Sequence, residues 1–362
     1  MAAALFRGKD LLLLEHNSLP AAKINISGGG RCNITNENLS PSFYLGDPAF
    51  ITSVFKTFDN RDLLRFLKAN GLEPVLRKSG QYFCKESSRE IIEVLLHLTK
   101  AVPIRLNTEI TGVERETGGF AVHTASGTFF AKRVLVATGG LSYPRLGASP
   151  IGFRIAESLG HTVVAPRPAL AGLTLQPEQF WMKELSGLSL PVEIGVGRRK
   201  LSGDLLFAHR GISGPAVLNA SLFWNRGKIT VDFLPGVKLK SLLKRPHRSA
   251  ASLLPLPKRF IKAFFEATGI PQLPYAQMSE AQKQCLSLIK SYTLAPAGTF
   301  GYERAEVTKG GVSTDEIDPS TMQSRIVEGL YFAGEVADVT GMVGGYNFQW
   351  AFSSAAAAAK SV

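Results

Sequence analysis

The chain has little cysteine and no long apolar run. Its three cysteines, Cys32, Cys84 and Cys285, are an odd number without Cys-x-x-Cys spacing, which favours reduced thiols over a disulfide framework or a zinc site. The longest apolar stretches, Leu11 to Leu14 and an alanine-rich tail, are well short of the roughly 20 residues that span a bilayer. Met1 to Phe6 is also too short for the apolar region of a secretory signal. We therefore expect a cytoplasmic protein with no metal site and no membrane partner.

Acidic residues are fewer than basic ones. The 41 Lys and Arg residues outnumber the 29 Asp and Glu residues, which gives a formal net charge of +12 and favours anionic partners. The densest basic groups, Arg198 to Lys200 and Lys240 to Arg248, lack the interleaved aromatic residues of a single-strand nucleic-acid surface. We interpret them as solvated faces and expect a small-molecule substrate rather than nucleic acid. A hydrophobic share of 45% and a charged share of 19% exclude a disordered chain and allow two domains.

Three consecutive glycines near the N-terminus form the most informative motif. Gly28, Gly29 and Gly30 are followed by a polar run. Glycine adopts backbone angles closed to other residues and lets a ligand approach the main chain, while polar side chains offer donors and a fixed positive charge. A flexible surface loop is the alternative. We predict that this loop binds a phosphate-bearing cofactor through Lys23, Ser27, Gly28, Gly29, Gly30, Arg31, Cys32, Asn33, Thr35 and Asn36.

A second glycine-rich segment lies near the C-terminus. Leu330 to Ala333 is a short apolar run typical of a buried parallel strand, and Tyr346 to Ala359 has helix-forming composition. Gly344 and Gly345 therefore stand at a helix start, where unpaired N–H groups and a partial positive charge favour phosphate. An ordinary strand-to-helix connection is the alternative. The candidate contacts are Gly334, Glu335, Gly344, Gly345, Tyr346 and Asn347.

Both segments resemble those of bacterial FAD flavoproteins of the aminoacetone oxidase and BaiN (YhiN) type. Those proteins carry an Ile-Ser-Gly-Gly-Gly-Arg-Cys-Asn-x-Thr-Asn loop and a Gly-Glu-x-x-Asp-x-x-Gly-x-x-Gly-Gly-Tyr-Asn segment. Further matches are Val134 to Gly140, Leu205 to Pro215 and Val307 to Val312, so the similarity runs from about residue 2 to the end. The resemblance implies an α/β fold, in which a Rossmann-like FAD-binding domain carries an inserted β-rich plus helical domain. It also implies FAD as the cofactor and leaves open whether NAD(P)H is the reductant.

The resemblance also assigns roles to single residues. Glu15, at the end of an apolar strand, matches the acidic residue that accepts hydrogen bonds from the adenosine ribose. Thr138, Gly139 and Gly140 match a glycine turn that brings a second strand end near the cofactor. Glu335 stands where related flavoproteins place a carboxylate on the ribityl hydroxyls, with a solvated strand-end carboxylate as the alternative.

One motif of these flavoproteins is absent. They open with an apolar strand and a G-x-G-x-x-G turn that carries the pyrophosphate, whereas Met1 to Gly8 resembles only the end of the first helix and Asp10 to Glu15 is already the second strand. The first strand is central in the order 3-2-1-4-5-6, so we expect a gap in the sheet. A start codon assigned too late, a degenerate gene product, and replacement by another part of the chain are competing explanations. We favour the first.

Prolines and glycines mark the expected organisation of the chain. We expect the FAD-binding domain in residues 1–165 and 303–362, and the inserted domain in residues 166–302. Residues 47–69 predict two short helices with Asp59 as a cap, and residues 87–99 predict another helix. Residues 103–130 predict the strands of a meander, and residues 133–137 return to the parallel core.

Three residues are candidates for catalysis. In the inserted domain, His209 is suited to move a proton and Arg210 to hold a carboxylate, although such a histidine more often satisfies a local hydrogen bond. Cys32 is the third, because Arg31 and nearby N–H groups would lower its pKa. A small packing residue beside the cofactor is the favoured alternative for Cys32.

We predict an FAD-dependent oxidoreductase that acts on a small organic substrate, in which the flavin carries the chemistry. Amine oxidation and reduction of a C=C bond both occur among similar proteins. The sequence leaves that choice, the electron acceptor and the oligomeric state open. One alternative is an N-terminally truncated, non-catalytic remnant of these flavoproteins. Another is a tRNA-modifying flavoprotein, which the net charge of +12 keeps open.

Overall fold

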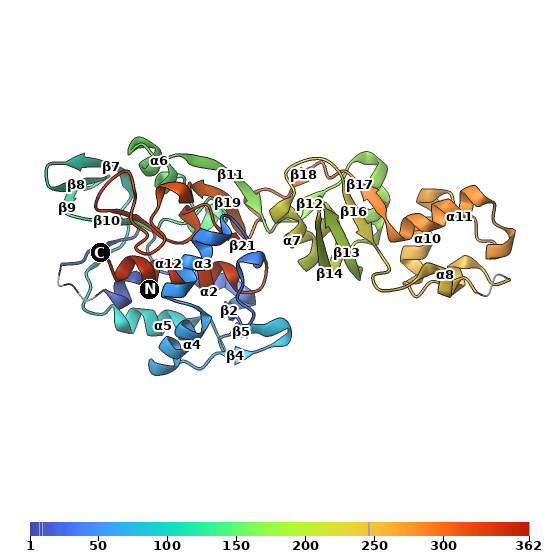
Figure 1. Cartoon of the computed structure of the whole chain (residues 1–362), viewed down its shortest axis with the longest axis horizontal. Coiled ribbons are helices and arrows are strands. Elements are labelled where there is room, and N and C mark those ends of the chain that lie inside the picture. The colour runs from blue at the N-terminus through green and yellow to red at the C-terminus, as the bar shows by residue number, and fades with distance from the viewer. Residues whose placement is uncertain (7, 9, 245–246, 362) are drawn as a thin grey trace. The chain divides into compact units, whose positions relative to one another are not determined.

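The chain forms two compact units. The computed structural model describes residues 1–6, 8, 10–244 and 247–361, so part of the basic stretch from Lys240 to Arg248 lies outside the described residues (Figure 1). One unit comprises Met1–Pro168 and Glu306–Val362, and the other comprises Ala169–Ala305. The boundaries expected from the sequence lie three residues earlier at each junction. The second unit is thus inserted between two parts of the first, which contains both termini (Figure 1).

Parallel strands of the first unit form two separate pairs. β1 (Leu13–Leu14) pairs with β6 (Ile104–Arg105), and β10 (Val134–Val136) pairs with β20 (Leu330–Phe332). In the order expected from the resemblance, the missing strand belongs between β1 and β10. Within the described part of the chain, no strand pairs with the second edge of either, so the expected interruption of the sheet is present. β1 is shorter than the predicted strand from Asp10 and has a partner on one edge only.

The helices of the first unit follow the predictions, and so does the meander except for residues 103–106, which contain β6, a strand that pairs in parallel with β1 instead. Residues 47–69 form α3 (Pro48–Thr57) and α4 (Asn60–Ala69), and residues 87–99 form α5 (Arg89–Leu98). The Asp59 carboxylate accepts hydrogen bonds from the N–H groups of Arg61 and Asp62 at 2.8 Å, and so caps α4 as predicted. The meander consists of β7 (Ile110–Glu116), β8 (Gly119–Thr124) and β9 (Gly127–Ala131).

The remaining elements of the first unit surround the parallel pairs. They are α1 (Ala2–Leu5), α2 (Ala22–Gly30), β2 (Asn33–Asn36), β3 (Tyr44–Leu45), β4 (Val75–Leu76), β5 (Gln81–Phe83), α6 (Ile151–Ser158), β11 (Val163–Ala169), β19 (Val307–Val312), β21 (Thr340–Gly341) and α12 (Tyr346–Ala359). The last helix has the predicted bounds. β11 pairs with β19, and β21 pairs with β3.

The last helix connects two apolar clusters of the first unit. Trp350 and Ala357 of α12 belong to the larger cluster, whereas Phe352 and Ala356 belong to a second one with Ile34. The buried residues of α12 lie on more than one of its faces and include polar Gln349 as well as Trp350, which is only 1% exposed. α12 therefore packs into both apolar clusters and links them within the first unit.

The second unit is built on an antiparallel sheet. Its strand order is β17-β16-β13-β14-β15-β12-β18, and helices follow in the basic stretch beyond residue 238, so the β-rich plus helical insertion is confirmed. The aromatic side chains of Trp181, Phe233, Phe260, Phe264 and Tyr292 pack together. The elements are β12 (Leu173–Thr174), β13 (Ser189–Val196), β14 (Arg199–Ala208), β15 (Gly211–Ser213), α7 (Pro215–Phe223), β16 (Ile229–Asp232), α8 (Leu239–Leu242), α9 (Ala250–Leu253), α10 (Lys258–Thr268), α11 (Glu280–Ser287), β17 (Tyr292–Leu294) and β18 (Gly298–Thr299).

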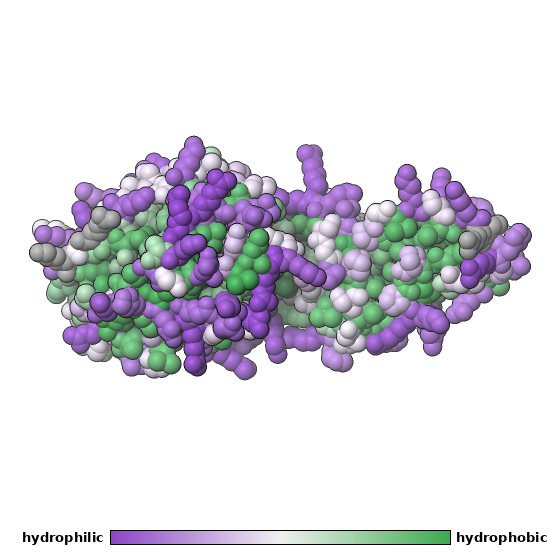
Figure 2. All heavy atoms as spheres, turned by 90° about the horizontal axis from the view of Figure 1, so that it is seen from below, coloured by the Kyte–Doolittle hydropathy of each residue, from purple (hydrophilic) through white to green (hydrophobic). Residues whose placement is uncertain are grey.

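The surface mixes hydrophilic side chains with small apolar areas. Figure 2 shows apolar residues between charged ones over both units. In the first unit, Leu19 is 72% exposed and Leu12, beside β1, is 39% exposed. No helix in the described part of the chain combines the length and apolar character needed to cross a bilayer.

Loss of the Asp59 cap should destabilise the first unit. In Asp59→Ala, the N–H groups of Arg61 and Asp62 lose their acceptor, so we expect the free energy of unfolding to fall by about 1 kcal/mol. Urea denaturation measures this change. Glu73→Ala is the control, because Glu73 forms only an exposed ion pair with Lys68 and should change stability by less than about 0.5 kcal/mol. Equal losses in the two variants would contradict the capping role.

Candidate functional site

The two glycine-rich segments lie against each other. Asn36 donates through Nδ2 to the carbonyl oxygen of Gly344 at 3.1 Å, although the residues are 308 positions apart. Thr35 donates through Oγ1 to Oε1 of Gln349, in α12, at 2.5 Å. A β-carbon on Gly345 would lie 2.6 Å from the Thr35 carbonyl oxygen, so only glycine fits. The two segments, each predicted to contact the cofactor, therefore lie side by side in the first unit.

The glycine triplet forms a left-handed turn at the end of α2. Gly28, Gly29 and Gly30 have φ angles of +57°, +66° and +83°, which residues with a side chain seldom adopt. A β-carbon on Gly28 would meet the main-chain N of Asn33 at 2.8 Å, whereas nothing lies within 4 Å of one on Gly29 or Gly30. The predicted loop is partly regular structure: helical turns precede Ser27, and β2 follows, where Ile34 is buried in the core. The open main chain is confined to Gly29 and Gly30.

Glu335 joins three parts of the first unit. Its Oε2 lies 2.5 Å from Nζ of Lys23, and its Oε1 accepts a hydrogen bond from the N–H of Thr308 at 2.8 Å. A β-carbon on Gly140 would come within 2.7 Å of the same Oε1. The structure thus gathers Lys23, Gly140 and Glu335, which were predicted separately from distant segments, around one carboxylate.

Thr308, on β19, was not among the predicted residues. Its buried Oγ1 accepts hydrogen bonds from the N–H groups of Leu141 and Ser142 at 2.7 and 3.1 Å. It therefore fixes the turn that contains Gly139 and Gly140, while its own N–H holds Glu335. The sequence indicated this strand only through the resemblance of Val307 to Val312. Nothing in the sequence shows that Thr308 contacts the Gly140 turn and Glu335.

Two buried polar atoms in this region have no hydrogen-bond partner within the described residues. They are Oδ1 of Asn33 and Oγ1 of Thr138. The Asn33 oxygen lies beside Gly345, 2.8 Å from the position of an added β-carbon, while its Nδ2 donates to Gln81. Buried polar atoms without partners are costly and usually indicate a missing water or ligand. Both residues were predicted to contact a cofactor, and both have unused hydrogen-bonding capacity.

Other predicted residues are engaged locally. Glu15 follows β1 and accepts a hydrogen bond from the N–H of Asn17 at 2.9 Å. The Asn347 amide donates to and accepts from the main chain of Gly341 at 2.9 and 2.8 Å. The Asn347 amide therefore closes a turn, and its role as a cofactor contact stays a prediction. The Tyr346 ring stacks on Phe43 at 4.8 Å, and burial raises the pKa of Tyr346 to about 12.

The catalytic candidates lie in different environments. Burial raises the pKa of the fully buried Cys32 thiol to about 12, so the expected lowering of its pKa is wrong and the packing role fits. Arg31 is exposed and does not offset this burial. His209 and Arg210 lie in the second unit, at the exposed turn between β14 and β15. The Arg210 guanidinium lies 5.3 Å from the centre of the Phe300 ring.

Ionisable groups with shifted pKa values occur on and near β19. Lys309 is buried and Asp338 is half-buried. Burial raises the pKa of Asp338, against a hydrogen bond from the N–H of Gly310. Burial, assisted by Arg167, lowers the pKa of Lys309 to about 8. Sequence reasoning missed these groups, although a lysine inside an apolar strand is itself an unusual feature.

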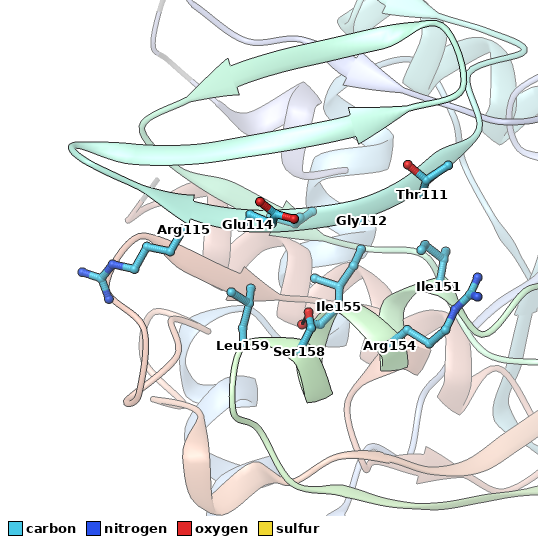
Figure 3. Close-up of a pocket in the computed structure, with 10 residues that line it drawn as sticks. Thr111, Gly112, Glu114, Arg115, Ile151, Arg154, Ile155, Ser158 and Leu159 are labelled. Carbon is cyan, nitrogen blue, oxygen red and sulfur yellow. Dashed lines mark hydrogen bonds between the residues drawn. The ribbon is translucent and has the colours of Figure 1, made fainter.

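A cavity of about 550 Å³ lies between β7 and α6 (Figure 3). Ile155 of α6 and Leu159, just after this helix, point toward β7, while the Arg115 side chain extends away from the cavity. The other lining residues are Thr111, Gly112, Val113, Glu114, Ile151, Arg154 and Ser158. The cavity shares no lining residue with either glycine-rich segment, so we assign it no part in cofactor binding.

Comparisons with known proteins give full-length matches. The family described as HI0933-like protein Rossmann domain matches residues 1–361. A ribosomal RNA dihydrouridine synthase of Escherichia coli K12 is 38% identical over 369 residues, covering 98% of this chain and 92% of the relative. A protein of the same name from Haemophilus influenzae is 37% identical, covering 98% and 93%. A 3-dehydro-bile acid delta(4,6)-reductase of Clostridium scindens is 31% identical, covering 95% and 90%.

Lys309 should make stability depend on pH. Its pKa of about 8 in the folded chain is below its ordinary value of 10.5, so the unfolded chain binds more protons between these values and the free energy of unfolding rises with pH there. In Lys309→Met, this rise should shrink by up to about 3 kcal/mol, as measured by urea denaturation from pH 8 to 10.5. Lys56→Met, at an exposed position, should keep the wild-type dependence. An unchanged slope in Lys309→Met would refute the effect of burial.

Proposed function

Since the chain belongs to the HI0933-like family of Rossmann-domain proteins, we propose that it is an FAD-dependent reductase of a C=C bond conjugated to a carbonyl group. This proposal rests on the names of the relatives. Dihydrouridine is uridine with the ring C=C bond reduced, and a delta(4,6)-reductase of a 3-dehydro compound acts on double bonds conjugated to a ketone. Both reactions add two hydrogens across such a bond, which favours C=C reduction over amine oxidation.

The residues of the first unit fit FAD. The main chain is open at Gly29, Gly30 and Gly139, where nothing lies within 4 Å of an added β-carbon. Asn33 and Thr138 each have a buried oxygen without a partner, which suits a ligand with many hydroxyl groups. These features support binding in the region where the two glycine-rich segments meet.

Each part of this region would contribute a different interaction. The N–H groups of Gly29, Gly30 and the α12 start at Gly345 would donate to phosphate oxygens. Glu335, fixed by Thr308 and Lys23, would accept hydrogen bonds from ribityl hydroxyls, and Lys23 balances its charge. Bound FAD, once reduced by NAD(P)H, would supply a hydride to one carbon of the C=C bond, and the other carbon would take a proton from water.

We further propose a uracil base in RNA as the substrate. The two relatives named for ribosomal RNA are 38% and 37% identical to this chain, whereas the bile acid reductase is 31% identical. The net charge of +12 also favours a polyanion. This substrate replaces the small organic molecule as the first choice and would place the protein in the cytoplasm. A conjugated cyclic ketone is the second candidate, supported by the reductase relative.

A methyl group on Gly29 should weaken FAD binding more than it weakens the fold. Gly29 and Gly71 have φ angles of +66° and +82°, and an added β-carbon has open space at both, so each alanine variant should lose only about 1 kcal/mol of stability through backbone strain. We expect the Kd for FAD to rise about tenfold or more in Gly29→Ala and to stay unchanged in Gly71→Ala. Flavin fluorescence titration and urea denaturation measure the two quantities.

Equal FAD affinity in these two variants would contradict the glycine turn as a binding element. A wild-type protein that is colourless and cannot be reconstituted with FAD would instead support the non-catalytic remnant.

The reconstituted protein should reduce uracil in RNA. With NADPH and unmodified transcripts of bacterial ribosomal RNA, we expect one or more uridines to gain two hydrogen atoms, detected by mass spectrometry of the digested RNA. Glu335→Gln should lower the retained FAD and the rate about tenfold or more, because the neutral amide is a weaker acceptor for ribose-type hydroxyls. Glu328→Gln, at an exposed position, should match the wild type. Reduction of a conjugated ketone without any change in RNA would favour the second candidate.

A further inference from the structure

The positive charge is concentrated in the inserted unit. Residues 169–305 contain 18 Lys and Arg against 8 Asp and Glu, whereas the rest of the chain contains 23 against 21. The inserted unit therefore carries +10 of the net charge of +12. An excess of this size in about 140 residues is the electrostatic signature of a polyanion-binding unit.

One end of the sheet in this unit gathers five cations. The turn between β13 and β14 carries Arg198, and Arg199 and Lys200 begin β14. β16 runs antiparallel to β13 with Gly195 opposite Thr230, so Arg226 and Lys228, just before β16, lie at the same end. All five side chains are exposed. We call Arg198, Arg199, Lys200, Arg226 and Lys228 the hairpin-end patch.

Few acidic groups neutralise the hairpin-end patch. Lys200 lies 2.9 Å from Glu193, and Asp232, which also acts on Lys200, forms its own ion pair with Lys290 at 2.6 Å. Among the described residues, Arg198, Arg226 and Lys228 have no carboxylate partner. Their charges are therefore free to meet an external anion.

The aromatic residue at this end does not offer a free stacking surface. The Arg199 guanidinium lies 4.1 Å from the centre of the Phe223 ring, at the end of α7, which orients the guanidinium plane and covers the ring. Single-strand binding surfaces stack bases on open aromatic rings. Cations without such rings suit the phosphates of a folded RNA, whose backbone is contacted without reading its sequence.

We propose that the hairpin-end patch binds the phosphate backbone of folded RNA. This inference rests on the proposed RNA substrate and assigns the affinity for that substrate to the inserted unit. The patch contributes affinity that does not depend on base sequence, whereas the choice of base belongs to the reductase site.

The test compares two triple variants of the full-length protein with equal loss of charge. Arg198→Gln, Arg226→Gln and Lys228→Gln remove the unpaired cations of the patch. Lys240→Gln, Lys244→Gln and Lys258→Gln remove three exposed lysines from α8, the turn after it and the start of α10 in the same unit. Binding of a labelled RNA hairpin is measured from low to high salt, together with the thermal midpoint and FAD content.

We expect the patch variant to bind the hairpin about tenfold or more weakly at low salt. Its slope of log K against log salt should be smaller in magnitude by about 2 to 3, because three phosphate contacts are lost. The lysine control should retain most of the affinity, and the thermal midpoint and FAD content should not change in either variant. Equal losses in the two variants, or wild-type binding in the patch variant, would overturn the proposal.

A second measurement separates RNA from a lipid surface and from failure of the reductase proposal. Vesicles of phosphatidylglycerol and phosphatidylethanolamine that compete with the hairpin on equal terms would overturn the assignment to RNA. If no uridine is reduced but the patch variant alone loses RNA binding, the patch stands and the reaction fails. If uridine is reduced and RNA binding is unaffected by the patch variant, the reaction stands and the patch fails.

Discussion

Gly345 lies so close to the Thr35 carbonyl group that a β-carbon would come within 2.6 Å of the oxygen. This approach joins segments from opposite ends of the chain, and Asn36 and Thr35 complete the contact through their bonds to Gly344 and Gln349. Gly345, with a φ angle of +93°, is also the N-cap of α12. This helix supplies Trp350 to one apolar cluster and Phe352 to the other. The contact that forms the candidate site is therefore also a condition for packing the first unit.

A single carboxylate organises the other side of this region. Glu335 follows β20 and the Gly140 turn follows β10, so both stand at the carboxyl ends of adjacent parallel strands, where α/β proteins place their ligands. Thr308 holds the two together from β19, and Lys23 approaches from α2. Four segments thus meet at the carboxyl ends of β10 and β20. The arrangement offers hydrogen-bond acceptors and open glycine turns but few cations, which suits a bound dinucleotide better than a large polyanion.

Features determined by local sequence were predictable. The glycine motifs, the Asp59 cap, the meander and the bounds of α12 depend on nearby residues or on strong patterns. Features determined by burial among distant segments could not be predicted from the sequence. Arg31 suggested a lowered pKa for Cys32, but residues from several distant segments bury the thiol and raise it. Thr308 and Lys309 acquire their contacts from segments more than a hundred residues away. The turn that the Asn347 amide closes was not predicted either, because its partner, Gly341, cannot be identified before the turn is folded.

The distribution of charge indicates a division of labour between the two units. The first unit has nearly balanced charge, 23 basic against 21 acidic residues. Of the two cations in its glycine-rich segment, Lys23 is already paired with Glu335, and Arg31 is exposed. A site of this kind can hold one cofactor but has little charge left to attract a long polyanion. Under the proposed function, the excess of the second unit would supply that attraction at exposed side chains, where a change of charge leaves the packed core intact. Substrate affinity and the reducing chemistry would then depend on separate sets of residues.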